Sequence, residues 1–303
     1  MRKFFLDQGF IEVETPAVVE VPGHEPFLDP RRVDGGWLIT SPEFHMKRLL
    51  ASGSSPRIFQ ICRCFRGGEE SPRHRPEFTM VEWYRSRAAY DRIATDVERL
   101  VVSTARALRG TDVVRGPHGP VALQTPWPRI TVADAFRMFA GIHLRAAHDV
   151  RSLRRQAQDA GCESIDDSDD WASAFHKLLV ELVEPGLASM GRGIHLRAYP
   201  AKLAALAQLD PRDASVAQRF ESYAAGLELA NGFGELTDPR LQRRRFREER
   251  LERQKRGSPA LAVDEPFLRD LARMPPASGV ALGLDRLIML VTSADHIDDV
   301  VAF

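Results

Sequence analysis

A long hairpin is the feature that most constrains the fold of this chain. Residues 57–65 and 78–85 are largely apolar segments that predict two paired strands. Residues 66–76 between them are polar and rich in Gly and Arg, and they are too many for a tight turn. Because long loops between paired strands often bind ligands, this hairpin predicts an antiparallel sheet with a functional loop at one end.

Patterns elsewhere in the chain place helices around this sheet. Strands are predicted at residues 10–14, 37–40, 193–199, 220–223, 227–230 and 278–282. Helices are predicted at residues 2–8, 41–53, 91–108, 238–256, 264–273 and 285–291, with three more within 131–190, while 109–129 has the Gly and Pro content of an irregular segment. We therefore expect an α+β fold, an antiparallel sheet flanked by helices, in a single domain over residues 1–303 with a helical insertion around 109–190.

The charge balance and the few cysteines limit the partners and the compartment. Lys plus Arg and Asp plus Glu each number 42, so the net charge is zero, which argues against a long nucleic acid as the main partner. Cys62, Cys64 and Cys162 have no disulfide spacing and indicate a reduced, cytoplasmic protein. Cys62 and Cys64 share a strand face and are interpreted as packing residues, since no further metal ligands have suitable spacing. No segment has the length of a membrane span or the character of a signal peptide.

The strongest chemical pattern lies on the hairpin. Arg66 follows the first strand, where its guanidinium can form bidentate hydrogen bonds to an α-phosphate or a carboxylate. The Phe78 ring at the start of the second strand could stack on a purine. Alternation places Phe78, Met80, Glu82 and Tyr84 on one face. A carboxylate there is costly if buried unpaired, and a ligand cation would supply the pair. The alternative is an amphipathic strand whose Glu82 meets an arginine.

Two carboxylates form the second pattern. Glu221 and Glu228 lie on neighbouring predicted strands and could face each other. Paired carboxylates repel unless a cation lies between them, and Mg²⁺ bridging nucleotide phosphates is the natural candidate. The alternative is a pair of solvent-exposed glutamates at a sheet edge.

The third pattern is a small-residue strand, residues 278–284, that leads into Asp285 and Arg286. Small residues let a ligand approach the backbone, and an arginine in the first turn of a helix opposes the helix dipole, which suggests an anion or ring nearby. The alternative is tight packing beside a solvated arginine. No phosphate-binding Gly-rich loop and no G-x-S-x-G motif is present, so an ATP-using enzyme of this sequence must hold phosphates with side chains and metal.

Together these segments resemble the signature motifs of class II aminoacyl-tRNA synthetases. Gly9 to Pro16 resembles motif 1, whose proline ends a dimer-interface strand; Phe65 to Tyr84 resembles motif 2; and Gly279 to Arg286 resembles motif 3. The similarity covers nearly the whole chain in the right order. It implies the class II fold and a homodimer formed through the motif 1 region.

Within class II, Ser41-Pro42-Glu43, residues 73–80 and residues 228–235 resemble lysyl-tRNA synthetases and, more closely, elongation factor P lysine ligases. Motif 1 begins within ten residues of Met1, so we expect no anticodon-binding OB domain, and Ala281 is as in the ligases. The resemblance implies that ATP activates lysine or (R)-β-lysine as an adenylate, which is transferred to a lysine of elongation factor P, with tRNA an unlikely partner. The alternatives are a truncated lysyl-tRNA synthetase and a non-catalytic synthetase-like binding protein.

The resemblance also implies roles for individual residues. For the nucleotide, the catalytic arginines Arg66 and Arg286 would bind the phosphates, with His74 beside them. Phe78 and Arg286 would stack on the adenine, and Glu221 and Glu228 would bind Mg²⁺. Relatives usually have Phe-Arg-x-Glu in motif 2. Because Gly68 occupies the position of that glutamate, Glu69 is expected to take over its contact with the adenine amino group.

The amino-acid half has its own implied residues. Glu43 and Glu82 would bind the substrate amine nearer the carboxylate, and Glu235 and Tyr84 would bind the ε-ammonium group. Asn231 would bind the carboxylate end, and Ala281 would shape the pocket. A dicationic amino acid suits such a set of carboxylates. The sequence does not distinguish α-lysine from β-lysine, since the methyl of Ala281 decides only about 1 kcal/mol.

Overall fold

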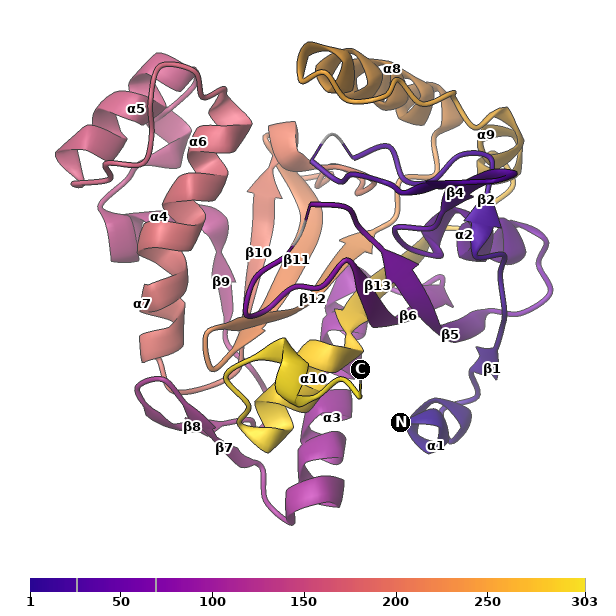
Figure 1. Ribbon diagram of the computed structural model, residues 1–303, viewed down its shortest axis with the longest axis horizontal. Helices are drawn as coiled ribbons and strands as arrows, with labels where there is room; N and C mark the ends of the chain where they lie inside the picture. The colour runs from indigo at the N-terminus through magenta and orange to yellow at the C-terminus, as the bar shows by residue number, and fades with distance from the viewer. Residues whose placement is uncertain (26, 69, 303) are drawn as a thin grey trace.

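An eight-stranded sheet forms the centre of the molecule in the computed structural model, which describes residues 1–25, 27–68 and 70–302 (Figure 1). The strand order is β1-β5-β6-β13-β12-β11-β10-β9. The predicted α+β class is confirmed, and the inner strand pairs are antiparallel. Both edge pairs, β1–β5 and β9–β10, are instead parallel, so the sheet is mixed at its edges.

The elements have the following bounds. The main sheet contains β1 (Ile11–Glu12), β5 (Arg57–Phe65), β6 (Glu77–Ser86), β9 (Arg129–Thr131), β10 (Ile194–Pro200), β11 (Val216–Ala224), β12 (Leu227–Gly234) and β13 (Ala277–Gly283). Two small sheets contain β2 (Val18–Val19), β3 (Arg32–Val33) and β4 (Gly36–Leu38), and β7 (Val113–Gly116) and β8 (Gly119–Ala122). The helices are α1 (Arg2–Leu6), α2 (Glu43–Ala51), α3 (Tyr90–Arg109), α4 (Val132–Ala140), α5 (Val150–Asp159), α6 (Trp171–Leu178), α7 (Glu184–Ser189), α8 (Pro239–Lys255), α9 (Glu265–Leu271) and α10 (Leu284–Thr292).

The two faces of the sheet have different characters. On one face, apolar residues such as Trp83 and Val280 pack against α3 and α10 in the largest buried cluster. Side chains alternate along each strand, so the intervening residues point to the opposite face. There, α2, α8 and α9 form a second apolar cluster around Phe246 and Phe267 that covers only part of the sheet. This second face carries the candidate site.

The segment 109–190 is less helical than the sequence predicted. Residues 109–129, expected to be irregular, contain the β7–β8 hairpin, and β9 adds an edge strand to the main sheet. The Gly and Pro residues form the turn of this hairpin instead of preventing strands. The three expected helices are present: α4, α5, and α6 running into α7 through a π-helical turn, Leu179–Val183.

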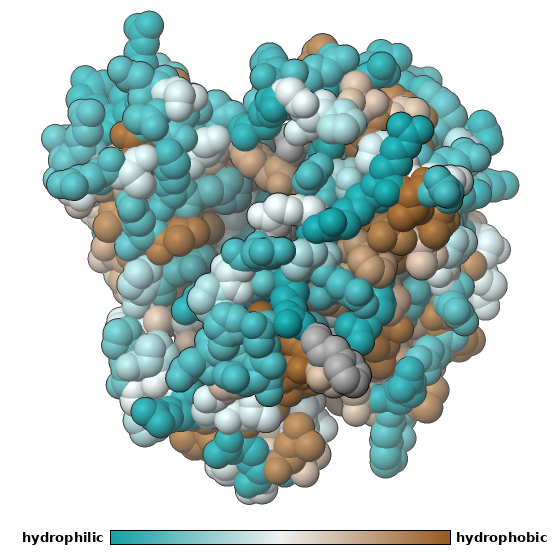
Figure 2. Space-filling model, in the orientation of Figure 1, coloured by the Kyte–Doolittle hydropathy of each residue, from teal (hydrophilic) through white to brown (hydrophobic). Residues whose placement is uncertain are grey.

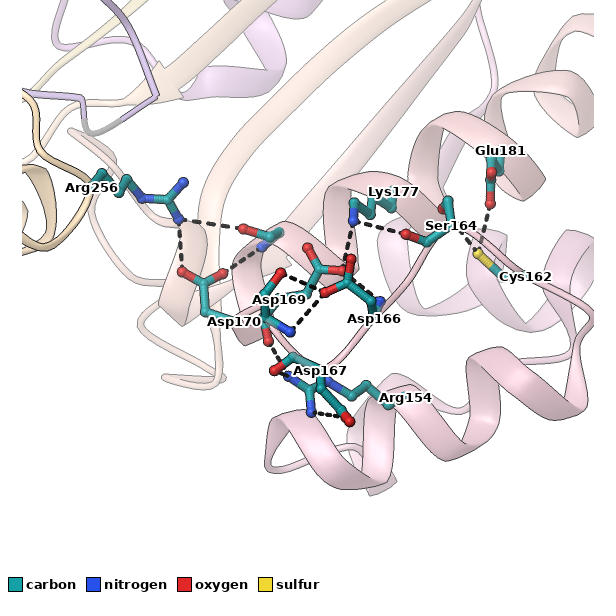
Figure 3. Close-up of polar contacts among 12 residues, drawn as sticks. Arg154, Cys162, Ser164, Asp166, Asp167, Asp169, Asp170, Lys177, Glu181 and Arg256 are labelled. Atoms are coloured by element: carbon teal, nitrogen blue, oxygen red, sulfur yellow. Dashed lines mark hydrogen bonds and ion pairs between the residues drawn. The ribbon is translucent and has the colours of Figure 1, made fainter.

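The acidic connection between α5 and α6 is held by local contacts (Figure 3). Asp169 pairs with Lys177 at 2.7 Å. Asp170 accepts a hydrogen bond from the Ser173 amide at the start of α6 and pairs with Arg256, just beyond α8, at 2.8 Å. These acids therefore stabilise the insertion and connect it to α8. In the same orientation, a hollow lined by hydrophilic side chains separates the α5–α6 part from α8 on the surface (Figure 2).

None of the helices within the described ranges combines the length and the apolarity that crossing a membrane requires.

Candidate active site

A row of neighbouring residues crosses the second face of the sheet. Glu82 of β6 pairs with Ala281 of β13, Ala281 pairs with Asn231 of β12, and Asn231 pairs with Glu221 of β11. Directly paired residues in adjacent strands point to the same face. The register therefore brings together four of the predicted site residues from three distant parts of the chain.

A bulge in β12 brings Glu228 to the same face. Glu228 and Asn231 are three residues apart and would point to opposite faces of a regular strand. The pairing shifts between Ser222 and Tyr223, so that Glu228 lies opposite Tyr223 while Leu229 is the extra residue. Glu228 and Asn231 consequently line one cavity.

This cavity has a volume of about 300 Å³ and contains most of the predicted nucleotide residues. Its lining includes the predicted Arg66, His74, Phe78, Glu228, Asn231, Ala281 and Arg286, together with Arg73, Arg75, Met80 and Asp285. Arginine and histidine side chains form a large part of this lining, which suits an anionic phosphate chain. The predicted Glu69 lies outside the described residues, so its contact with adenine stays a prediction.

Arg66 lies over the ring of Phe78, with 5.0 Å from the guanidinium carbon to the ring centre. The Arg66 amide donates to the Pro76 carbonyl at 2.8 Å and closes the base of the motif 2 loop. Its Nε is buried and has no hydrogen-bond partner among the described residues. A buried donor without a partner favours a bound acceptor.

Arg286 connects Glu228 to the motif 2 loop. Its guanidinium donates to the Glu228 carbonyl at 2.8 Å and lies 3.2 Å from the Glu228 carboxylate. It also contacts His74 Nε2 at 2.5 Å, while His74 Nδ1 lies 2.7 Å from Ser71 Oγ. Burial, followed by Arg286 and Arg66, lowers the pKa of His74 to about 4. His74 is thus neutral near pH 7, with Nε2 accepting from Arg286 and Nδ1 donating to Ser71.

Glu221 is a buried acceptor, and the alternative of an exposed edge glutamate is wrong, because only 5% of it is exposed. Tyr199 and Tyr223 donate to one of its oxygens at 2.5 and 2.7 Å, and Arg219 donates to the other at 2.6 Å. Burial opposes ionisation, but Arg219 and the tyrosine hydroxyls outweigh it and lower the pKa of Glu221. Glu221 is therefore held as an anion behind the cavity.

A third carboxylate, Glu184 of α7, lies beside this pair. Burial, with Glu228 and Glu221 adding to it, raises the pKa of Glu184 to about 7, and burial and Glu221 raise the pKa of Glu228. No cluster of three or more metal-ligating side chains was found within the part of the chain that the structure describes. Mg²⁺ in nucleotide sites needs only one or two carboxylates besides the phosphates, so Glu228 on the cavity and Glu221 behind it suit this ion.

The amine end of the site is made of buried carboxylates. Glu82 is 2% exposed, and its oxygens accept from Ser41 Oγ at 2.9 Å and from the Tyr84 hydroxyl at 2.6 Å. Burial and then Glu43 raise the pKa of Glu82 well above its ordinary value. Tyr84 thus bonds to Glu82, although the resemblance groups it with Glu235. Ser41 also accepts from the Glu43 amide, and α2 spans Glu43–Ala51 within the predicted 41–53.

Gly279 lets two of these side chains come together. A Cβ on Gly279 would lie 2.2 Å from Tyr84 Cε1 and 2.7 Å from Glu235 Oε1. The small residues of β13 therefore make room for protein side chains at this position, whereas the sequence pattern predicted room for a ligand.

Lys47 completes the amine end and was not predicted from the sequence. Its Nζ lies 2.5 Å from Glu43 Oε1 and 2.6 Å from Glu235 Oε2. Although burial alone would lower the pKa of Lys47, Glu235 and Glu43 raise it. Burial raises the pKa of Glu235 to about 8, with Lys47 opposing the rise and Glu43 adding to it. The only signal in the sequence is the spacing of four residues between Glu43 and Lys47, one helical turn.

Comparison with known proteins adds a family to this geometry. Residues 1–303 match the family model for tRNA synthetases class II (D, K and N). The chain is 39% identical to the elongation factor P–(R)-beta-lysine ligase of Erwinia tasmaniensis, and the match covers all of this chain and 91% of that protein. Ligases of the same name from Haemophilus influenzae and Klebsiella pneumoniae are 39% and 38% identical, with the same coverage.

Proposed function

Because this chain belongs to the class II tRNA synthetase family, and within it to the group of the elongation factor P–(R)-β-lysine ligases, we propose that it activates lysine or (R)-β-lysine with ATP and transfers it to a lysine side chain of elongation factor P. One observation carries the proposal. A cavity lined by Arg66, Arg286 and His74 adjoins a row that leads to Glu82, and Glu43 and Glu235 lie beside that glutamate. Cationic side chains for phosphates and carboxylates for amines thus occupy the two ends of one sheet face.

The first step forms the adenylate. A carboxylate oxygen of the amino acid attacks the α-phosphorus of ATP, the bond to the bridging oxygen breaks, and pyrophosphate leaves. Arg66 would hold the α-phosphate and the attacking carboxylate, and Arg286 would neutralise charge toward the leaving group. Glu228 and Glu221 would hold Mg²⁺, an ion that would supply further positive charge for the phosphates.

The second step transfers the aminoacyl group. The neutral amine of the acceptor lysine attacks the carbonyl carbon of the adenylate, AMP leaves with the electron pair of the broken bond, and the acceptor amine loses a proton. Asn231 lies between the amine end and the nucleotide end, and its buried Oδ1 has no hydrogen-bond partner among the residues described. The Asn231 side-chain NH₂ would donate to the carbonyl end of the amino acid, while Oδ1 would accept a hydrogen bond from the bound substrate.

The same proposal includes a homodimer in the cytoplasm, built through the motif 1 region. Leu6 and Ile11 are 56% and 53% exposed at this end of the chain, and β1 is an edge strand. Exposed apolar side chains beside an open strand edge are typical of a protein contact.

Adenylate formation and acceptor choice test the proposal. The protein is incubated with ATP, Mg²⁺ and either α-lysine or (R)-β-lysine, and exchange of labelled pyrophosphate into ATP is measured. Elongation factor P or bulk tRNA is then offered, and the added mass is located. We expect amino-acid-dependent exchange and label on elongation factor P. Label on tRNA alone would refute the acceptor, and an Arg66→Ala variant with undiminished exchange would refute the site.

A further inference from the structure

Lys47 is a buried cation whose partners belong to the amine end of the site. It is 1% exposed, and a lysine in such a position is costly unless its charge is paired. Within the described ranges, its ion pairs are those with Glu43 and Glu235. Both partners are carboxylates assigned to the substrate amines, and neither is an acid of the surrounding scaffold.

The geometry leaves part of each carboxylate available. Lys47 follows Glu43 by one turn of α2 and contacts Oε1 of Glu43, while on Glu235 it contacts Oε2. The other oxygen of Glu235, Oε1, is buried beside the backbone of Gly279 and receives no hydrogen bond from a described side chain. Glu235 is only 2% exposed. A buried carboxylate oxygen without a side-chain donor favours a ligand that brings one.

The charges at this end then match a dication. Burial raises the pKa values of Glu82 and Glu235, and once these two groups have lost their protons Glu43, Glu82 and Glu235 carry three negative charges while Lys47 carries one positive charge. Two negative charges remain for a ligand, and an amino acid with two ammonium groups carries two positive charges there. Without Lys47, three adjacent buried carboxylates would repel one another and retain additional protons. Such protons would have to leave before the substrate ammonium groups could bind.

We propose that Lys47 is a built-in counter-ion of the amine pocket, a positioning residue that orients Glu43 and Glu235 toward the two ammonium groups of the substrate and matches the pocket charge to a diamino acid. This inference rests on the proposed function, because it takes the substrate to be lysine or β-lysine. It differs from a scaffolding role, in which loss of Lys47 would lower the fraction of folded protein and affect ATP and lysine alike.

The first test compares Lys47→Met, which keeps the side-chain length without the charge, with Lys47→Arg, which keeps the charge. Lysine-dependent pyrophosphate exchange is measured with each. Truncating one partner of a buried charge pair weakens binding by roughly 30-fold or more, so the KM for lysine should rise by that factor in Lys47→Met. The KM for ATP and the kcat at saturating lysine should change by less than about threefold. Lys47→Arg should lie between this variant and the wild type.

The second test restores the missing charge from solution. Lys47→Ala is assayed with added propylammonium, which can occupy the vacated space, and with propan-1-ol, a neutral molecule of similar size. We expect propylammonium to lower the KM for lysine toward the wild-type value and propan-1-ol to have no such effect. Equal rescue by the alcohol would overturn the inference, because the space alone would then matter.

The outcomes separate this inference from the proposed function. If the wild type shows lysine-dependent pyrophosphate exchange and Lys47→Met has an unchanged KM for lysine, the counter-ion role of Lys47 is refuted and the proposed function stands. A rise of both KM values together in Lys47→Met assigns the residue to the scaffold and also refutes it. A wild-type protein that neither binds lysine in calorimetry nor forms an adenylate refutes both.

Discussion

Replacing Gly279 with alanine should damage the amine pocket from inside the sheet. Gly279 lies in β13 between Tyr84 of β6 and Phe233 of β12, so its backbone is fixed by pairing on both sides. The added Cβ would lie 2.2 Å from Tyr84 Cε1 and 2.7 Å from Glu235 Oε1. Both side chains are 2% exposed and have little space into which they can move.

The expected cost follows from these contacts. Carbon and oxygen atoms need roughly 3.5 Å of separation, so Glu235 must retreat by close to an ångström and the Tyr84 ring by more. Overpacking of this kind destabilises proteins by about 1–3 kcal/mol. Movement of the Tyr84 ring would also break its 2.6 Å hydrogen bond to Glu82, which costs about 1–2 kcal/mol of stability. We therefore expect the free energy of unfolding to fall by about 2–5 kcal/mol, and lysine affinity to fall by roughly tenfold, the equivalent of that one hydrogen bond.

The assay is urea unfolding together with calorimetric titration of lysine without ATP. Gly283→Ala is the matched control, because it is the same substitution in the same strand and the nearest atom to its Cβ would be Arg286 Cβ at an ordinary 3.7 Å. Because Gly283 is also the N-cap of α10, the unfolding free energy of this control should fall by no more than about 1 kcal/mol. Equal losses in the two variants, or unchanged lysine binding in Gly279→Ala, would refute this account of the pocket.

Three further predictions concern other parts of the site. Since burial raises the pKa of Glu235 to about 8, this carboxyl must release a proton to receive an ammonium group. Lysine affinity measured by calorimetry should therefore increase as the pH rises from about 6.5 to about 8.5, and a pH-independent affinity would contradict this. Phe78→Ala should raise the KM for ATP by roughly tenfold with little change for lysine, because it removes a stacking surface; equal effects on both substrates would count against adenine stacking there. Leu6→Asp combined with Ile11→Asp should convert a dimer to a monomer in light scattering, and a persistent dimer would place the interface elsewhere.

The nucleotide half of the site was largely predictable because its residues lie in regular strands or at their ends. Alternation placed Phe78 and Glu82 on one face, and the register of β5 and β6 over 57–65 and 77–86 agrees closely with the predicted hairpin. The resemblance to class II synthetases supplied the remaining positions. Its assignment of individual roles stays a prediction.

The features that were missed depend on contacts between distant segments. Lys47 is an ordinary helix residue until Glu235, far away in the chain, is placed beside it. Glu184 lies in a segment without a chemical signature, and only the fold brings it near Glu228. β9 has three residues and forms because β10 provides an edge for it, so local periodicity could not reveal it.

The bulge at Leu229 makes the position of Glu228 tolerant of a change in chain length. Deleting Leu229 would leave Glu228 two residues before Asn231 in an unbroken strand, so both side chains would still point to the same face. The deletion would remove the Leu229 side chain from the apolar cluster on the opposite face and leave the cavity its glutamate. A shorter β12 is therefore compatible with the same site, at a cost in core packing alone.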